Sequence, residues 1–413
     1  MQEIQGGITA AKGFKAASAA AGIKYQGRND MAMILSDVPC TAAGTFTSNI
    51  VKAAPVLWDR KLVQDGGTVR AVVVNTGIAN AGCGPEGMAV CEDTAAYAAE
   101  VLGITKEEVL IGSTGVIGPV IDMNKLKNGI RLLVPALSDS REAAFEASKA
   151  IMTTDTVNKE CAVSIELPSS DGTGTVTVTL GGMSKGSGMI HPNMCTMLGY
   201  IATDAAVEKG LLQKALSAVV PDTFNMITVD GDTSTNDTLL VLSNGLAENA
   251  PITEEDESFE LFKKALTYVC KTLAIKMAAD GEGASKLIEV CVKNADTKEN
   301  ARTLARSVAG SSLVKAMIFG KDANCGRILC ALGYAGPGFD PAVIEIDIVG
   351  ESGKVNFYTD GKIQPFDEEL ALAILSEKKI HIDCDMAEGT FEATAWGCDL
   401  TYDYVSINAD YRS

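Results

Sequence analysis

Apolar runs and amphipathic stretches alternate along the first half of the chain, so strands and helices are expected in turn. The β-branched run at 69–75 predicts a buried strand. Residues 161–167 and 174–180 alternate apolar and polar positions, which predicts a hairpin around 169–172. Further strands are expected at 31–38, 44–48 and 108–111, and helices at 55–64, 86–102, 125–133 and 141–152.

The same mixture continues after residue 196. A long amphipathic helix is expected at 258–277, with Ser258 as its N-cap. Other helices are expected at 206–219, 298–308 and 368–377, and strands from 196 to 202 and at 238–242, 343–349, 354–358, 379–383 and 391–396, with a last extended piece ending at Ser413. Helices and strands mixed throughout favour layered α/β packing, and short turns between strands favour mixed sheets.

Composition indicates a globular protein with a large core. The 413 residues are 46% hydrophobic and 21% charged, and the net charge is -18. Such a negative field repels nucleic acid and anionic membrane surfaces, so neither is expected as a partner. No apolar run reaches the length of a membrane span, and the N-terminus lacks the pattern of a signal peptide, so we expect the protein in the cytoplasm.

Cysteine and histidine usage restricts the chemistry. The eleven cysteines include no C-x-x-C pair, and Cys325 and Cys330 have no histidine nearby, so neither a zinc site nor any other metal site is expected. His191 and His381 are the only histidines. A Ser-His or Cys-His enzyme would therefore depend on one of these two residues.

The segment KGSGMIHPNMCTML, from Lys185 to Leu198, is the strongest candidate for chemistry. Its glycine-rich loop leads into Thr196. If the chain were cut between Cys195 and Thr196, the new terminal amine would titrate at about 7.7–8.0 and could activate the neighbouring hydroxyl without a histidine. The alternative is that Thr196 is an ordinary residue at the start of a strand.

Two further features suit such a reaction. Ser113-Thr114-Gly115 follows a short strand, and a glycine N–H beside a hydroxyl could face a developing oxyanion, although a plain turn is the simpler interpretation. Lys185 is the only charged residue in a long neutral stretch. Its ammonium could bind a carboxylate, or it could be an ordinary surface lysine.

Other motifs lack the context that their chemistry requires. Residues 182–186 match G-x-S-x-G, but the glycines and proline that follow oppose the helix of a nucleophile elbow. Residues 186–188 lack the third glycine of a dinucleotide loop. The acidic stretch 230–237 resembles a calcium loop only loosely, because Thr235 stands where the loop needs glycine, so a polar turn is preferred.

The combination of blocks resembles the glutamate N-acetyltransferase family, also called the ornithine acetyltransferase family, of arginine biosynthesis. The resemblance spans the chain and is carried by the self-cleaving segment 185–198 with 203–205 after it. Six further blocks occur in order at 45–49, 112–118, 151–156, 230–237, 280–284 and 407–413.

The resemblance implies a role for each matched residue. Thr196 is expected to be the nucleophile, released by autocatalytic cleavage of the Cys195–Thr196 bond, with Thr114 and Gly115 as the oxyanion hole. The expected substrate contacts are Thr154, Lys185, Thr196, Glu282, Asn408 and Ser413. The implied reaction moves an acetyl group from N2-acetyl-L-ornithine to L-glutamate through an acetyl-Thr196 intermediate.

The resemblance also implies an αββα-type sandwich and an α₂β₂ heterotetramer. Residues 1–195 would form the α chain and 196–413 the β chain, entwined in one α/β body. No cofactor is expected, and acetyl-CoA stays open as a second acetyl donor. Two alternatives remain: an N-terminal-threonine amidase or aminopeptidase that uses the same Thr196, and an inactive, uncleaved binding homologue.

Overall fold

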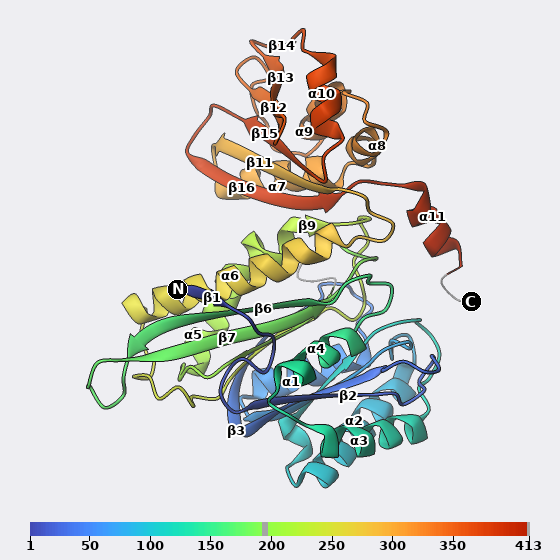
Figure 1. Ribbon diagram of the computed structural model, residues 1–413, viewed down its shortest axis with the longest axis vertical. Coiled ribbons are helices and arrows are strands. Elements are labelled where there is room, and N and C mark those ends of the chain that lie inside the picture. Colours follow the sequence, from blue (N-terminus) through green and yellow to red (C-terminus); the bar gives the residue numbers. More distant parts are fainter. Residues whose placement is uncertain (192–196, 411–413) are drawn as a thin grey trace. The chain divides into compact units, whose positions relative to one another are not determined.

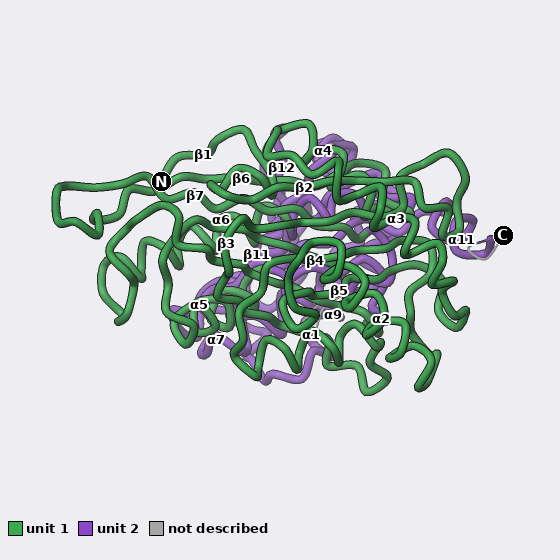
Figure 2. Tube along the Cα trace, turned by 90° about the horizontal axis from the view of Figure 1, so that it is seen from below, with its two compact units in different colours: residues 1–186, 192–223, 233–273 green, residues 187–191, 224–232, 274–413 purple. Residues whose placement is uncertain are grey.

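The computed structural model describes residues 1–191 and 197–410, which fall into two compact units (Figure 2). Unit 1 comprises Met1–Gly186, Pro192–Thr223 and Thr233–Leu273, and unit 2 comprises Ser187–His191, Phe224–Asp232 and Ala274–Ser413. Each unit mixes helices with a mixed sheet, so the α/β class expected from the sequence is confirmed. Residues from both sides of position 196 contribute to each unit.

The described strands of unit 1 form a nine-stranded sheet in the order β1-β6-β7-β8-β10-β3-β4-β5, with β2 also paired to β3. Strands β7 and β8, which precede and follow position 196, pair antiparallel. The strands are β1 Gln2–Ile4, β2 Phe14–Ala19, β3 Met31–Phe46, β4 Val69–Asn75, β5 Val109–Ser113, β6 Lys159–Pro168, β7 Thr175–Lys185, β8 Leu198–Thr203 and β10 Thr238–Ser243.

Strand β3 corrects the sequence prediction of two separate strands at 31–38 and 44–48. It runs unbroken for 16 residues, and its pairing with β4 shifts register between Leu35 and Cys40. Pro39 lies within this irregularity, where a missing N–H removes no ladder hydrogen bond. The first part of β3 pairs with β2 and β4 and the second part with β10, so β3 connects the two halves of the sheet.

The two halves of this sheet face each other across the core. Tyr200 of β8 and Gly112 of β5 are not in neighbouring strands, yet a Cβ on Gly112 would lie 2.0 Å from the Tyr200 hydroxyl. A larger residue at this position would have to displace the Tyr200 side chain. Buried apolar residues from both halves form one cluster, and Figure 1 shows the β6–β7 and β2–β3 pairs as separate layers of this unit.

Five α-helices lie entirely within the described part of unit 1. Helices α3 and α4 pack on β2, α1 on β5 and α5 on β3. The Ser140 side chain caps α4 by accepting the Ala143 N–H at 3.2 Å, as expected of a serine at this position. The bounds are α1 Ala54–Asp65, α2 Gly84–Leu102, α3 Met123–Ala136, α4 Arg141–Ala150 and α5 Lys209–Val219.

In the described part of unit 2, seven strands form a sheet in the order β14-β13-β12-β15-β11-β16-β9. The interior strand β11, which the sequence prediction missed, pairs parallel with β15 and antiparallel with β16. The strands are β9 Ile227–Thr228, β11 Leu287–Ala295, β12 Glu345–Gly350, β13 Gly353–Thr359, β14 Lys362–Ile363, β15 Lys379–Asp385 and β16 Phe391–Cys398.

Helix α6 (Glu257–Ala279) contains the division between the units, and the other helices of unit 2 are α7 Lys298–Gly310, α8 Ser312–Gly320, α9 Gly326–Gly333, α10 Glu368–Leu375 and α11 Tyr402–Ala409. Helices α8 and α9 were not predicted. The prediction of an extended C-terminal piece was wrong, because residues 402–409 form α11. Strand propensity of Tyr, Val and Ile is a weak preference that context overrides. None of the described helices combines the length and hydropathy of a membrane span.

Candidate active site

The loops that follow β4 and β5 in unit 1 are joined by backbone hydrogen bonds. The Thr114 N–H donates to the Asn75 carbonyl at 3.1 Å, and the Val116 N–H donates to the Gly77 carbonyl at 3.1 Å. The Ala79 N–H returns a bond to the Val116 carbonyl at 3.0 Å. These contacts fix the backbone on both sides of Thr114 and Gly115, the residues expected to form the oxyanion hole.

Two donors in this loop remain available. The Thr114 N–H is already engaged, but the Thr114 hydroxyl and the Gly115 N–H have no hydrogen-bond partner among the residues described. Gly115 has φ of +129°, and a Cβ there would lie 2.3 Å from the Gly77 carbonyl carbon, so glycine is required. A hydroxyl and an N–H that are available on a fixed backbone can stabilise a developing oxyanion.

Asn236 holds the same loop and was not singled out from the sequence. Its buried amide donates to the Ser113 carbonyl at 2.8 Å and also to the Ala79 carbonyl. The Thr235 hydroxyl donates to Asn236 Oδ1 at 2.7 Å, which fixes the orientation of the amide. Asn236 therefore connects the loop after β4, at Ala79, to the loop after β5, at Ser113, the residue before Thr114. The only feature of the sequence that could have indicated a role for Asn236 was its place in the polar block 230–237.

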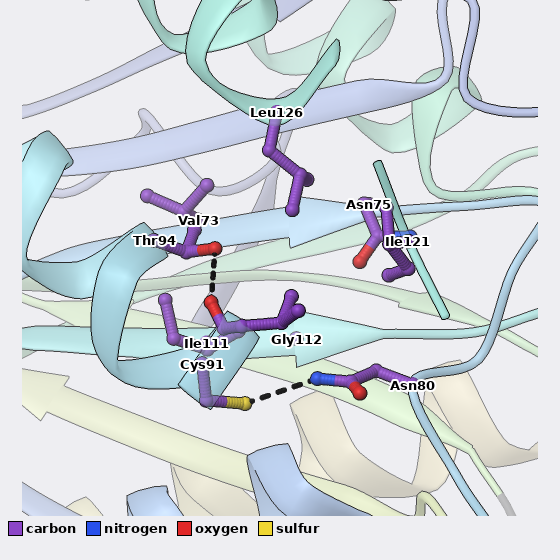
Figure 3. Close-up of a pocket in the computed structure, with 10 residues that line it drawn as sticks. Val73, Asn75, Asn80, Cys91, Thr94, Ile111, Gly112, Ile121 and Leu126 are labelled. Atoms are coloured by element: carbon purple, nitrogen blue, oxygen red, sulfur yellow. Dashed lines mark hydrogen bonds between the residues drawn. The ribbon is translucent and has the colours of Figure 1, made fainter. Parts of the chain in front are cut away.

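A small cavity lies against β5 in unit 1 (Figure 3). Its lining includes Asn80, Cys91 and Gly112, and it offers about 10 Å³ to the centre of a water molecule. The Asn80 amide donates to Cys91 Sγ at 3.3 Å, and the Thr94 hydroxyl donates to the Val90 carbonyl at 2.6 Å. This space suits a single water and is too small for an amino-acid substrate.

Lys185 ends β7 in unit 1 and is almost fully buried. Its ammonium lies 3.8 Å from Asp155 Oδ2 and makes no hydrogen bond to any described residue. Asp155 also pairs with Lys159 at 2.7 Å and accepts the Gly186 N–H at 2.7 Å. Burial alone would raise the pKa of Asp155, but the charges of Lys185 and Lys159 hold it below its usual range. Thr154, next to Asp155, is half-buried.

Glu282 lies in unit 2, in the turn between α6 and β11. The Asn408 amide, from α11, donates to Glu282 Oε2 at 2.7 Å, so the structure brings these two predicted residues together. The other carboxylate oxygen of Glu282 has no partner in the described part of the chain. A Cβ on Gly188 would lie 2.2 Å from the Glu282 carboxyl carbon, so the glycine leaves room for this side chain.

The expected site residues therefore form two described groups. Thr114, Gly115, Thr154 and Lys185 belong to unit 1, whereas Glu282 and Asn408 belong to unit 2. Cys195, Thr196 and Ser413 lie outside the described residues.

The segment that leads toward position 195 is held by Asp230 in unit 2. Its carboxylate accepts the N–H groups of Met189 at 2.6 Å and Ile190 at 2.8 Å, and the Tyr404 hydroxyl donates to it at 3.2 Å. This use of the carboxylate fits the polar turn preferred from the sequence over a calcium loop. His191 bonds to the Thr228 hydroxyl, and burial together with Arg306 lowers its pKa.

The serine-nucleophile alternative does not fit. Ser184 is fully buried inside β7, where it pairs with Gly199 of β8, so it does not occupy a turn from strand to helix. His381 lies on β15 between Glu289 and Asp383. Within residues 1–191 and 197–410, no cluster of three or more His, Cys, Asp or Glu side chains could hold a metal ion.

Comparison with known proteins shows the family to which the chain belongs. The ArgJ family model matches residues 15–413. An "arginine biosynthesis bifunctional protein ArgJ" from Symbiobacterium thermophilum is 49% identical over all of both chains, and the one from Bacillus subtilis is 42% identical over 100% of this chain and 98% of its own. The crystal structure of the ArgJ protein from Bacillus halodurans is 45% identical, with a TM-score of 0.48 over 51% of this chain and 97% of that chain. The chain therefore belongs to the ArgJ family and is an acyltransferase of arginine biosynthesis.

Proposed function

We propose that this protein transfers an acetyl group from N2-acetyl-L-ornithine to L-glutamate through an acetyl ester on Thr196. The observation that carries this proposal is the fixed loop in which the Thr114 hydroxyl and Gly115 N–H have no partner among the described residues. Acyl transfer needs donors of this kind, because negative charge develops on the carbonyl oxygen in its transition state. The family assignment supports the same reaction.

The catalyst forms by cleavage of the chain. The Thr196 hydroxyl attacks the Cys195 carbonyl, the Thr196 nitrogen leaves as an amine, and water hydrolyses the resulting ester. The products are an α chain of residues 1–195 and a β chain of residues 196–413. Strands β7 and β8 belong to different products yet pair along six residues, and β10 pairs with β3 in the same sheet, which supports continued association after cleavage.

Acetyl transfer then proceeds in two half-reactions. The Thr196 hydroxyl attacks the acetyl carbonyl of N-acetylornithine and its proton passes to the α-amine, which is near its pKa at neutral pH. The ammonium formed in this way gives its proton to the departing nitrogen as the C–N bond of the acetamide breaks, and free ornithine is released. The amino group of glutamate next attacks the acetyl ester, and N-acetylglutamate leaves as Thr196 recovers its proton. Thr114 and Gly115 stabilise the oxyanion in each half-reaction.

Charge complementarity assigns the substrate contacts. The Lys185 ammonium makes no hydrogen bond to a described residue, so it is suited to bind the substrate carboxylate. Thr154, next to Asp155 in the chain, is proposed as a second contact to that carboxylate. Glu282 presents a carboxylate oxygen to the ornithine ammonium, and the bond from Asn408 orients it. Ser413 is proposed as a further contact on the family resemblance alone.

Several broader features belong to the same proposal. The enzyme is a cytoplasmic α₂β₂ heterotetramer of its own cleaved chains, and it uses no metal or prosthetic group because the Thr196 amine acts as the base. Acetyl-CoA is a second acetyl donor, consistent with the word "bifunctional" in the names of the relatives.

N-terminal sequencing of the purified protein tests the cleavage. Wild-type protein should give two shorter bands on a denaturing gel, one of which begins at Thr196. Thr196→Ala should stay as a single 43.1 kDa band and transfer no acetyl group. Full transfer activity by an intact chain, or by the alanine variant, would refute the mechanism. An intact and inactive wild-type chain would favour the binding homologue.

A second assay separates transfer from hydrolysis. N-acetylornithine supplied with glutamate should give N-acetylglutamate, and little acetate should form without glutamate. Release of acetate at the same rate in both mixtures would identify an amidase instead. Lys185→Met should raise the KM for N-acetylornithine much more than it slows self-cleavage, and equal losses would contradict its assignment to the carboxylate.

A further inference from the structure

A buried ion pair lies directly behind Lys185 in unit 1. The Lys159 ammonium contacts Asp155 Oδ1 at 2.7 Å, and neither side chain is exposed to solvent. Lys159 also donates to the Val157 carbonyl at 3.1 Å. The cost of burying two charges can exceed what their attraction returns, so stability alone does not account for such a pair.

Asp155 serves two cations and two backbone groups. Its carboxylate accepts the N–H groups of Gly186 at 2.7 Å and Thr153 at 3.0 Å, and it lies 3.8 Å from the Lys185 ammonium. Together the two lysines and the one carboxylate carry a net charge of about +1 when all three are ionised. Lys159 has the shorter contact with Asp155, at 2.7 Å against 3.8 Å for Lys185, so Lys185 is the ammonium without a direct contact to this carboxylate.

Among the described residues, no carboxylate other than that of Asp155 lies within ion-pair distance of Lys185. Glu160, the neighbour of Lys159 in β6, is held by Arg141 through two hydrogen bonds of 2.9 and 2.7 Å and also accepts the Asn158 amide. Lys185 is itself only 7% exposed, so water can compensate its charge only in part. A buried cation with no hydrogen-bond partner favours an incoming anion.

We propose that Lys159 is the counter-ion of Asp155 and thereby keeps the charge of Lys185 available to a substrate carboxylate. The inference rests on the proposed function, since it assumes that Lys185 reads that carboxylate. Without Lys159, Asp155 would be left with Lys185 as its partner, and the 3.8 Å separation would shorten to a direct ion pair. Lys159 is therefore a positioning residue, which acts through Asp155 and does not itself contact the substrate.

Charge-matched variants test this role. Lys159→Met should raise the KM for N-acetylornithine by about tenfold or more, because the substrate must compete with Asp155 for Lys185. The carboxamide analogue of N-acetylornithine has no carboxylate, so its KM should change by less than about threefold. The double variant Asp155→Asn with Lys159→Met removes one charge of each sign and should return the KM for N-acetylornithine to within about threefold of wild type.

The control is Lys149→Met, which removes a half-exposed lysine paired with Glu146 on the same unit and should leave both KM values unchanged. An equal rise in KM for the acid and the carboxamide in Lys159→Met would overturn the proposal and assign Lys159 a purely structural role. If Lys159→Met does not fold, the double variant decides alone. A KM for N-acetylornithine within about threefold of wild type supports the proposal, and a rise of tenfold or more overturns it.

Failure of the proposed function would look different. If Lys185→Met leaves the KM for N-acetylornithine unchanged, the carboxylate site itself is wrong. If Lys185→Met raises that KM and folded Lys159→Met does not, the carboxylate site at Lys185 is supported and only the proposed role of Lys159 is refuted.

Discussion

Gly188→Ala should weaken recognition of the ornithine ammonium without a change to any charged residue. A Cβ at this position would lie 2.2 Å from Glu282 Cδ and Oε2 and 2.4 Å from Oε1, whereas ordinary contact begins at 3.4 Å. The carboxylate must therefore retreat by about 1 Å. Gly188 is not among the residues with positive φ, so the substitution adds no backbone strain and its effect falls on Glu282.

The magnitude follows from the contact that is lost. The Asn408 amide donates to Glu282 Oε2 at 2.7 Å, and a hydrogen bond to a charged group contributes about 1.5–3 kcal/mol. At about 1.4 kcal/mol per factor of ten, loss of this orientation should raise the KM for N-acetylornithine by about 10- to 100-fold. Self-cleavage does not involve the ammonium and should continue at close to its normal rate.

Steady-state kinetics with two acetyl donors provide the assay. N-acetylnorvaline lacks the side-chain ammonium, so its KM should be nearly the same in Gly188→Ala and wild type. Gly338→Ala is the matched control, because nothing lies within 4 Å of a Cβ at that position. The reasoning is refuted if both donors lose affinity equally, or if the KM for N-acetylornithine does not change in a folded variant.

Three further predictions concern other parts of the chain. Gly115→Ala should lower kcat by about 10²–10³-fold with little change in KM. The new Cβ would collide with the backbone of Gly77 and displace an oxyanion donor. A normal kcat in this variant would exclude the loop from catalysis. Asn236→Ala should lower kcat by about tenfold in a folded protein, because the Ser113 carbonyl loses its 2.8 Å hydrogen bond from the Asn236 amide. If the variant lowers only the melting temperature and leaves kcat unchanged, Asn236 contributes to stability and not to catalysis. The protonated His381 ring donates a hydrogen bond to the Glu289 carboxylate, and this bond raises the pKa of His381 above its usual value of about 6.5. Its stabilising effect should therefore be complete below about pH 6.5 and lost as the pH rises through the higher folded value. Urea unfolding between about pH 5 and 9 should show a smaller change of unfolding free energy with pH for His381→Gln than for wild type, and an unchanged pH dependence would contradict the coupling.

Sequence periodicity predicted the elements whose pattern is local. The buried strand at 69–75 appears as β4, and the alternating segments at 161–167 and 174–180 appear within the hairpin β6–β7. These predictions held because each residue's environment followed from its immediate neighbours. The spacing of apolar residues did not reveal that β3 is one strand, because its continuity past Pro39 depends on pairing with β4 and β10.

The candidate site divides in the same way. Thr114 and Gly115 could be proposed as an oxyanion hole because they belong to a loop of small residues after a predicted strand, and the conformation of such a loop depends on consecutive residues. Nothing in the sequence shows that Lys159 is fully buried or that it pairs with Asp155 behind Lys185. The bond between Asn408 and Glu282 joins residues 126 positions apart, and Asn236 reaches Ser113 across 123.

By itself, then, the sequence determined the mixed α/β class, the glycine-bearing loops and the residue types available for acyl transfer. Tertiary structure alone decided which charges face one another, which donors remain unpaired and where a side chain leaves no room for a methyl group. The physical reason is that backbone preference is set by near neighbours, whereas burial, hydrogen-bond satisfaction and Coulomb interaction depend on distances in space that only the packed chain defines.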